Sequence, residues 1–131
     1  MGMVIGEVAR NLGYRPGMAC AVLGNPPGMT FGLPNGATAA ADLILAFAAD
    51  KIALRAIAPR ALNLYGIGAR LWLAYPKKTG PVRSDLDRDH GWDPLTTEGL
   101  LPVTQVALDN TWSALRFRFR EEIPKVMRAG S

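Results

Sequence analysis

Three apolar segments of strand length divide the chain up to Tyr75. Residues 18–23, 42–48 and 70–75 are dominated by aliphatic and aromatic side chains, and each is followed within two residues by Gly, Asp or Pro. Short apolar runs that end at turn-forming residues are typical of strands buried on both faces. We therefore predict three buried strands in one sheet.

Between the second and third segments, the apolar residues recur with the spacing of a helix. Asp50 precedes an apolar face that continues to Leu62, with Pro59 as its single interruption. Asp is a favoured residue at a helix N-cap, so the pattern predicts a helix that begins at Asp50 and kinks at Pro59. A strand, a helix and a strand in this order form a βαβ unit, so residues 43–47 and 71–75 should be parallel and joined by a right-handed crossover.

The chain up to Thr38 adds one helix and one loop. Residues 3–12 place Val4, Val8 and Leu12 four positions apart and end at Gly13, which predicts a short amphipathic helix within residues 1–13. Residues 29–38 are rich in Gly and Pro and show no period, so we predict a loop.

After the third strand the chain shows two signals for short helices. Ser84 with Asp87 three residues later is a plausible N-cap, and Asp93-Pro94 is a second cap and first-turn pair that Gly99 would end. We therefore predict two short helical pieces, both between the third strand and Gly99.

The sequence ends with a predicted antiparallel hairpin and a tail. Residues 103–108 and 111–119 are β-rich and are joined by Asp109-Asn110, a pair suited to a two-residue turn with positive φ. Residues 119–131 form the tail, for which we expect a short helix at best and then fraying.

Length and composition indicate a single domain. The 131 residues contain 49% hydrophobic and 20% charged side chains, which excludes a disordered chain and fits one domain over residues 1–131. The longest apolar stretch, residues 37–49, contains Asp42 and is too short to span a bilayer. Since no secretory signal pattern is visible either, we expect a cytoplasmic protein without a membrane partner.

The positive net charge is dispersed along the sequence. The chain carries a formal charge of +4, with no excess over residues 1–49 and excesses of +3 in residues 50–70 and 116–128, separated by a deficit of −2 in residues 77–109. Nucleic-acid binders usually concentrate Lys and Arg on one helix face or groove. A nucleic-acid partner is therefore not expected.

Metal sites are poorly supported by the residue types present. Asp85, Asp87 and Asp89 match the start of a calcium-binding loop, but the sixth position is His90 and the twelfth is Thr96, where such loops need Gly and Glu. With one Cys and one His, the chain also lacks the usual zinc ligands. We predict no metal site.

The positions of the serines and of the cysteine disfavour nucleophilic catalysis. A hydrolase triad would require Ser84 or Ser113 within hydrogen-bond reach of His90, yet Ser113 shares strand parity with Leu115 and should face the core. Cys20 lies in an apolar run and is expected to be a small buried hydrophobe. No catalytic residue is predicted.

Charged and aromatic residues gather where strands end, which is where open α/β sheets usually bind ligands. They could hold an anionic or nucleotide-like ligand, with Trp92 or Trp112 as a stacking wall. The candidate binding residues of this group are Lys77, Lys78, Arg88, Trp92, Trp112 and Arg116.

The same charges have a structural explanation. Strand alternation turns Arg116 away from the apolar face of the last strand, where it could pair with Asp85, Asp87 or Asp89. In that case the charges would form an ion-pair network that ties the loop after the third strand to the hairpin.

Three motifs carry a resemblance to a known family. Residues 71–78, 85–92 and 112–118 resemble, in order, segments of a small bacterial family of unknown function, and the resemblance extends over residues 14–118. It implies a fold and no activity, because the family has no established one.

The order of elements also resembles the carboxyl half of S-adenosylmethionine-dependent methyltransferases. Residues 42–45 are similar to strand four of that form of the Rossmann fold, residues 71–75 to strand five, and the hairpin at Asp109-Asn110 to strands six and seven. The resemblance implies a minimal Rossmann-like, methyltransferase-like three-layer α/β sandwich. About five strands are expected, with a parallel core and a C-terminal antiparallel hairpin.

In such folds a Gly-rich loop after the first strand approaches the cofactor. Gly24, Asn25 and Gly28 occupy this place and complete the candidate binding residues, although Pro26 and Pro27 have no N–H to donate. No Asp or Glu occurs between Glu7 and Asp42 to bind a ribose. The cofactor is therefore left unknown.

Three functions of different classes follow. The favoured function is non-catalytic binding of a small anionic or nucleotide-like ligand, in a pocket beside Gly24 and Lys77. The first alternative is a protein-interaction or homo-oligomerising module that uses an edge strand, the apolar loop 29–31 or the tail 123–127. The second alternative is an S-adenosylmethionine-dependent methyltransferase-like enzyme.

Overall fold

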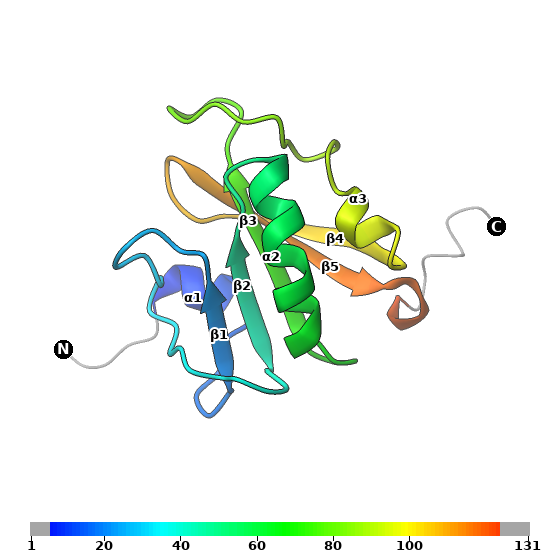
Figure 1. The fold of residues 1–131 in the computed structure, drawn as a ribbon. Helices are drawn as coiled ribbons and strands as arrows, with labels where there is room; N and C mark the ends of the chain where they lie inside the picture. Colours follow the sequence, from blue (N-terminus) through cyan, green and yellow to red (C-terminus); the bar gives the residue numbers. More distant parts are fainter. Residues whose placement is uncertain (1–5, 124–131) are drawn as a thin grey trace.

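A five-stranded mixed sheet forms the centre of the protein. The structure, a computed structural model, describes residues 6–123 (Figure 1). The strands lie in the order β1-β2-β3-β5-β4, with β1 (Cys20–Leu23), β2 (Leu43–Phe47) and β3 (Arg70–Pro76) parallel. The antiparallel hairpin of β4 (Leu100–Ala107) and β5 (Trp112–Phe119) completes the sheet, and β5 pairs with β3. The predicted parallel core and C-terminal antiparallel hairpin are confirmed.

Helices on both faces give the sheet three layers. The long helix α2 (Lys51–Leu64) and the short α3 (Asp93–Thr96) cover one face, and α1 (Glu7–Asn11) covers the other (Figure 1). A 3-10 turn, η1 (Arg120–Glu122), follows β5. The N-terminal helix is thus confirmed from Glu7 onward, while residues 3–5 of its predicted range lie outside the described residues.

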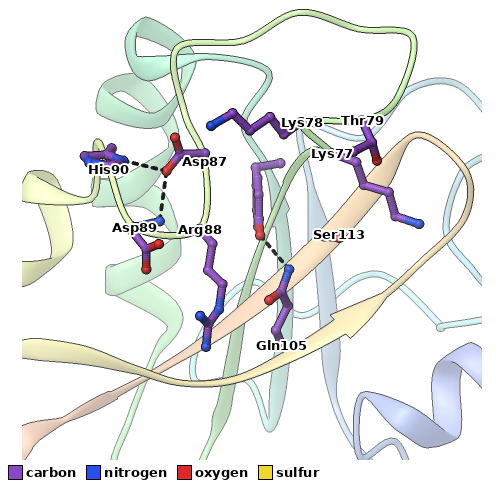
Figure 2. A pocket seen from close by; sticks show the side chains of 10 residues that line it. Lys77, Lys78, Thr79, Asp87, Arg88, Asp89, His90, Gln105 and Ser113 are labelled. Carbon is purple, nitrogen blue, oxygen red and sulfur yellow. Dashed lines mark hydrogen bonds and ion pairs between the residues drawn. The ribbon is translucent and has the colours of Figure 1, made fainter.

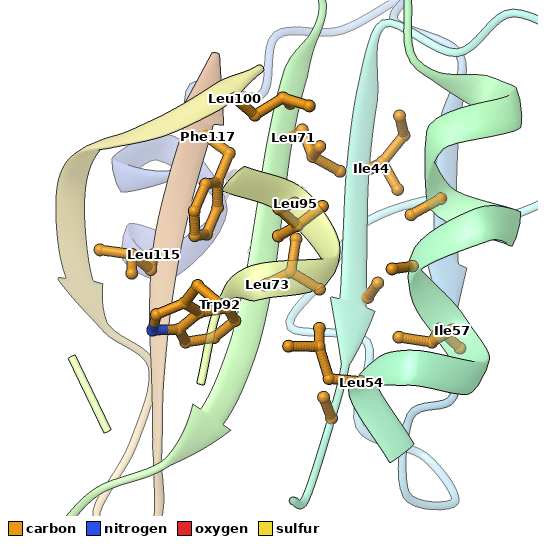
Figure 3. Close-up of a cluster of buried hydrophobic side chains, with 14 of the residues drawn as sticks. Ile44, Leu54, Ile57, Leu71, Leu73, Trp92, Leu95, Leu100, Leu115 and Phe117 are labelled. Atoms are coloured by element: carbon orange, nitrogen blue, oxygen red, sulfur yellow. The ribbon is translucent and has the colours of Figure 1, made fainter. Parts of the chain in front are cut away.

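The core on the α2 face contains mostly aliphatic side chains, together with the aromatic rings of Tyr75, Trp92 and Phe117. Figure 3 shows most of its larger members. Strands β2 and β3 contribute one row, α2 a second, and the α3 region with β5 a third. Its fully or nearly fully buried members include Ile44, Leu71, Leu73, Leu54, Leu95, Trp92 and Phe117. β2 is buried at all five positions, as the uninterrupted apolar pattern predicts.

The second core lies between the sheet and α1. The Trp72 indole Nε1 donates a buried hydrogen bond of 2.9 Å to the backbone oxygen of Leu12, which fixes the end of α1 on the sheet. Loop residue Phe31 stacks on Phe47, with ring centroids 6.3 Å apart, and Trp112 packs edge-on against Phe47 at 5.0 Å. The predicted loop 29–38 therefore covers part of the sheet.

Helix α2 begins where the sequence predicts. Asp50 Oδ1 accepts a hydrogen bond of 2.8 Å from the backbone N–H of Ala53. Asp85 Oδ1 accepts a second one, also of 2.8 Å, from the backbone N–H of Lys51. Two carboxylates at the N-terminus also interact favourably with the helix dipole. The helix continues through Pro59 to Leu64.

We expect Asp50→Ala to lower the free energy of unfolding by about 1 kcal/mol, because it leaves the Ala53 N–H without its cap. Urea denaturation followed by circular dichroism measures this loss. Asp50→Asn keeps an acceptor oxygen and should retain most of the stability. A loss as large in Asp50→Asn as in Asp50→Ala would show that charge, and not the cap, is responsible.

The predicted helix at Ser84 is wrong. Ser84 Oγ accepts a hydrogen bond of 3.0 Å from the N–H of Leu86, and Asp87 and His90 form an isolated antiparallel bridge. Side chains that bind nearby backbone groups in this way compete with helix formation. The second predicted helix is confirmed as α3, with Asp93 inside its first turn and Trp92 at the cap position.

The hairpin turn also differs from its prediction. Asp109 Oδ1 accepts hydrogen bonds of 2.8 Å from the N–H groups of both Thr111 and Trp112, and neither Asp109 nor Asn110 has a positive φ. An Asx turn thus replaces the expected two-residue turn. Strand β4 begins at Leu100, earlier than the predicted start at Val103, with a register shift between Pro102 and Thr104.

Within residues 6–123, no helix is long and apolar enough to cross a bilayer. The predicted tail begins with η1, and its residues 124–131 lie outside the described part of the chain.

Candidate functional site

A hollow of about 440 Å³ opens at the carboxyl end of β3, on the α2 face of the sheet (Figure 2). The end of β3, the β4–β5 hairpin and the loop that follows β3 form its walls. It is lined by Tyr75, Lys77, Lys78, Thr79, Asp87, Arg88, Asp89, His90, Gln105 and Ser113. This position corresponds to the ligand side of open α/β sheets.

Three neighbouring strands provide a polar floor. Tyr75 on β3 lies opposite Ser113 on β5, and Gln105 on β4 donates from Nε2 to the Tyr75 hydroxyl at 2.7 Å. Since the Tyr75 oxygen accepts this bond, its own O–H is left to donate. Burial raises the pKa of Tyr75 despite the opposing charge of Arg88, so the hydroxyl keeps its proton at neutral pH.

Three cationic side chains surround this floor. Lys77 and Lys78 follow the end of β3, and Arg88 comes from the opposite side of the hollow (Figure 2). Within residues 6–123, none of the three is in an ion pair, since the single pair found there joins His90 to Asp87. The three positive charges are therefore available to a ligand.

The turn that carries Arg88 is held in place by its own hydrogen bonds. Asp87 Oδ1 contacts His90 Nδ1 at 2.8 Å and accepts from the Asp89 N–H at 2.9 Å, while the Trp92 indole N–H donates to the Asp87 carbonyl at 2.8 Å. The hydrogen bonds from His90 and from the Asp89 N–H lower the pKa of Asp87. Its carboxylate thus orders the turn and presents Arg88 to the hollow.

Of the candidate binding residues, Lys77, Lys78 and Arg88 are brought together. Sequence reasoning missed Tyr75 and Gln105 as lining residues. Ser113 is buried, as its strand parity predicts, and also lines the hollow. The alternation of residues along β3 could have placed Tyr75 on the same face as the hollow. The position of Gln105 beside Tyr75 depends on how β4 pairs with β5, which no local sequence pattern reveals.

Neither tryptophan of the prediction lies in the hollow. Trp92 is 5% exposed and packs against Tyr75 and Phe117, with ring centroids 5.5 and 5.2 Å apart. Trp112 is buried on the other face of the sheet beside Phe47. Both therefore belong to the cores, and a stacking wall is not formed by either.

Arg116 lies on the opposite face from the hollow. It pairs in register with Trp72, whose side chain packs against α1, so it does not approach the aspartates after β3. Asp85 instead caps α2, and Asp87 binds His90. The expected ion-pair network is therefore wrong for the described residues.

The glycine loop after β1 is also separate. A Cβ at Gly24 would lie 3.0 Å from Ile57 Cδ1 and 3.1 Å from the Phe47 oxygen, so this glycine serves close packing. Asn25 Nδ2 donates to the Pro26 carbonyl at 3.3 Å, and Gly28 lines a second hollow around residues 27–32. None of Gly24, Asn25 or Gly28 lines the hollow beside Lys77.

Metal-binding and thiol groups add nothing to this hollow. Across residues 6–123, no group of three or more His, Cys, Asp or Glu side chains is placed to hold a metal ion. Cys20 is buried, and burial followed by the charge of Asp42 raises the pKa of its thiol. The thiol is therefore neutral at physiological pH.

Comparison with known proteins gives a distant structural likeness. No family model matches the chain, and no curated protein matches it either. Among solved structures, the chain is similar to a ribosomal protein L11 methylase from Lactobacillus delbrueckii subsp. bulgaricus, with a TM-score of 0.43 and 11% identity. The match covers 62% of this chain and 38% of the methylase chain. The description of the fold therefore rests on its own strand order, and the resemblance to a small bacterial family stays a prediction.

Proposed function

We propose that the protein binds a small anionic or nucleotide-like ligand, without catalysing a reaction, in the hollow at the carboxyl end of β3. The observation that carries this proposal is the presence of three cations, Lys77, Lys78 and Arg88, that have no ion-pair partner within residues 6–123 and surround a polar floor. Two carboxylates, Asp87 and Asp89, line the same hollow, so cations are in excess.

The chemistry of the lining suggests how such a ligand would lie. An acidic group would be bound by Lys78 and Arg88, since guanidinium and ammonium groups form strong charge-assisted hydrogen bonds with phosphate or carboxylate. The polar remainder would meet the Tyr75 hydroxyl, Ser113 and Gln105. A volume of about 440 Å³ lies within the usual range for small-molecule sites.

Binding without catalysis fits the contacts of the two side chains that a hydrolase would use. His90 is 74% exposed and pairs with Asp87, and no hydrogen bond joins it to Ser113 in the described part of the chain. Ser113 is 5% exposed on the floor. A nucleophile and its base would have to lie within hydrogen-bond reach of each other.

The interaction module receives less support. Met29 and Phe31 are half-buried and pack against the core on the α1 face, so the loop 29–31 is not an exposed apolar patch. The outer edge of β1 is also partly covered, because Gly36 and Ala37 donate to the Cys20 carbonyl.

A ligand screen tests the proposed function. Thermal unfolding would be measured with inorganic phosphate, AMP, ATP, nicotinamide dinucleotides, S-adenosylmethionine and S-adenosylhomocysteine, followed by calorimetric titration of those that raise Tm. At about a hundredfold excess over Kd, a bound ligand should stabilise the protein by roughly 2.7 kcal/mol, a shift of several degrees.

Charge-neutral variants locate the site. We expect Lys78→Gln and Arg88→Gln each to weaken binding about tenfold, the equivalent of roughly 1.4 kcal/mol. Arg55→Gln, an equal charge change on the exposed side of α2, should bind as the wild type does. The proposal would be contradicted if no ligand of the screen lost affinity in either pocket variant, or if no ligand gave any response. A response to S-adenosylmethionine and its product alone would favour the methyltransferase-like alternative.

A further inference from the structure

Three arginines form a second charged group, on the other side of the sheet from the hollow. Arg70 begins β3, and Arg116 and Arg118 lie near the end of the antiparallel β5. Arg116 is in register with Trp72, two positions beyond Arg70. Because alternate residues of a strand share a face, all three project from the α1 face, whereas the hollow is on the α2 face. We refer to Arg70, Arg116 and Arg118 as the arginine cluster.

The carboxylate of Glu122 partly offsets the charge of the arginine cluster but forms no ion pair with it. Within residues 6–123, none of its members is in an ion pair, and residues 1–5 and 124–131 contain neither Asp nor Glu. The side chain of Glu122 accepts from the Tyr65 hydroxyl and from the Gly68 and Phe119 N–H groups. It is the Glu122 backbone oxygen that accepts from Arg118 Nη2, at 2.9 Å.

Two further charged residues lie beside Arg70. Arg15, Asp42 and Arg70 line an open hollow of about 440 Å³ at the amino end of the parallel strands. The Asp42 carboxylate accepts from the Ala19 N–H at 2.8 Å and forms no ion pair within the described residues. With Arg15 included, four guanidinium groups and the carboxylates of Asp42 and Glu122 occupy this end of the sheet.

Such an arrangement costs stability as it stands. The Nε atoms of Arg116 and Arg118 are buried and have no hydrogen-bond partner in the described part of the chain. Burial, followed by the charges of Arg70 and Arg118, lowers the pKa of Arg116. Unpaired buried donors and like charges on adjacent strands both destabilise a fold. Costs of this kind are characteristic of functional sites.

We propose that the arginine cluster binds a phosphate group, either as inorganic phosphate or as part of a small phosphorylated molecule. Guanidinium groups present paired N–H donors that match phosphate oxygens, and a dianion offsets more of the cluster's charge than a single carboxylate does. The hollow lined by Arg15 and Arg70 has room for the rest of a phosphorylated molecule. This site is independent of the one under the proposed function.

Arg116→Met tests the proposal, because it removes the charge while keeping a long apolar side chain. Thermal unfolding would be measured with rising inorganic phosphate, and in parallel with AMP, at an ionic strength held constant with sodium chloride. We expect phosphate to raise Tm of the wild type and the affinity of Arg116→Met to fall at least tenfold. In phosphate-free buffer, Arg116→Met should be at least as stable as the wild type, since it removes a charge that has no ion-pair partner within residues 6–123.

Matched variants separate this site from the first one. Arg55→Met makes the same change on an exposed helix surface and should keep the full response to phosphate. Arg88→Gln should weaken binding in the hollow beside Lys77 and leave the response that depends on Arg116 unchanged. A stronger response to AMP than to phosphate would indicate a phosphorylated molecule, and equal responses would indicate that the phosphate group suffices.

Three results would overturn the proposal. The first is a phosphate response in Arg116→Met equal to that of the wild type. The second is no response of the wild type to phosphate or AMP; a lower Tm of Arg116→Met in phosphate-free buffer would then show that Arg116 only supports the fold. The third is binding of a single-stranded oligonucleotide without any effect of inorganic phosphate or AMP.

Discussion

Replacing Trp92 by alanine should lower the free energy of unfolding by about 4 kcal/mol. Trp92 is 5% exposed and packs near Phe117 in the core on the α2 face (Figure 3). Its indole also contacts the ring of Tyr75. Its Nε1 also donates to the Asp87 carbonyl. The substitution therefore opens a large cavity and leaves a carbonyl of the turn without its partner.

Urea denaturation measures this loss, and Trp92→Phe divides it into parts. Phenylalanine retains most of the buried ring area but has no N–H, so we expect a loss of about 1 to 2 kcal/mol. If the Trp92 hydrogen bond positions the turn, Trp92→Phe should also weaken ligand binding in the hollow while remaining folded. A loss for Trp92→Ala no larger than the one for Trp92→Phe would contradict the central place of the indole in this core.

The buried strands could be predicted because their signal is local. An uninterrupted apolar run such as residues 42–48 is explained by burial on both faces, whatever its neighbours are. The cap at Asp50 is equally local, since it concerns one carboxylate and an N–H three positions later. The parallel core followed from the helix that connects two such strands.

The candidate site could be predicted only in part, because its geometry depends on contacts between distant segments. Strand alternation correctly turned Arg116 away from the apolar face of β5. The face to which Arg116 points, however, is not the one on which the turn with Asp87 lies, and the sequence does not reveal on which side a loop returns. Trp92 illustrates the same limit, since its burial is set by Tyr75 and Phe117, which lie on two strands distant from it in the sequence.

Local hydrogen bonding explains why the helix prediction at Ser84 and the turn prediction at Asp109 are wrong. Ser84 carries a cap signal, yet its hydroxyl accepts from the N–H of Leu86 and forms a turn without a helix. Asp109 does the same at the hairpin, where it accepts from two backbone N–H groups. Ser and Asp favour caps and turns through the same side-chain bonds, so the residue type alone cannot distinguish between them.

Replacing Glu122 by alanine should lower the free energy of unfolding by about 3 kcal/mol at neutral pH, since its carboxylate binds three donors and hydrogen bonds to a charged group contribute about 1.5 to 3 kcal/mol each when well shielded. These donors are the Tyr65 hydroxyl, the Gly68 N–H at 2.9 Å and the Phe119 N–H at 3.0 Å. The bonds join the end of β5 to the loop between α2 and β3. Glu122 is half-buried, so we expect less than their sum.

The pH dependence identifies the charge as the cause. Burial opposes ionisation of Glu122, but the hydrogen bonds from Tyr65, Gly68 and Phe119 outweigh it and lower its pKa. A lowered pKa means that the stabilisation is fully present above the unfolded value of about 4.3 and is lost as the pH falls through the lower folded value. The difference in unfolding free energy between wild type and Glu122→Gln should therefore be constant from about pH 6 to 8 and shrink below about pH 4.

Glu121→Ala supplies the control, because this neighbouring carboxylate is exposed and should change stability by less than about 0.5 kcal/mol. Equal losses in the two alanine variants would contradict the specific role of Glu122. If the difference in unfolding free energy between wild type and Glu122→Gln is undiminished at about pH 3, the stabilisation comes from packing and not from the charge of Glu122. The charge of Glu122 also offsets that of Arg116, so its removal should destabilise Arg116→Met less than the wild type.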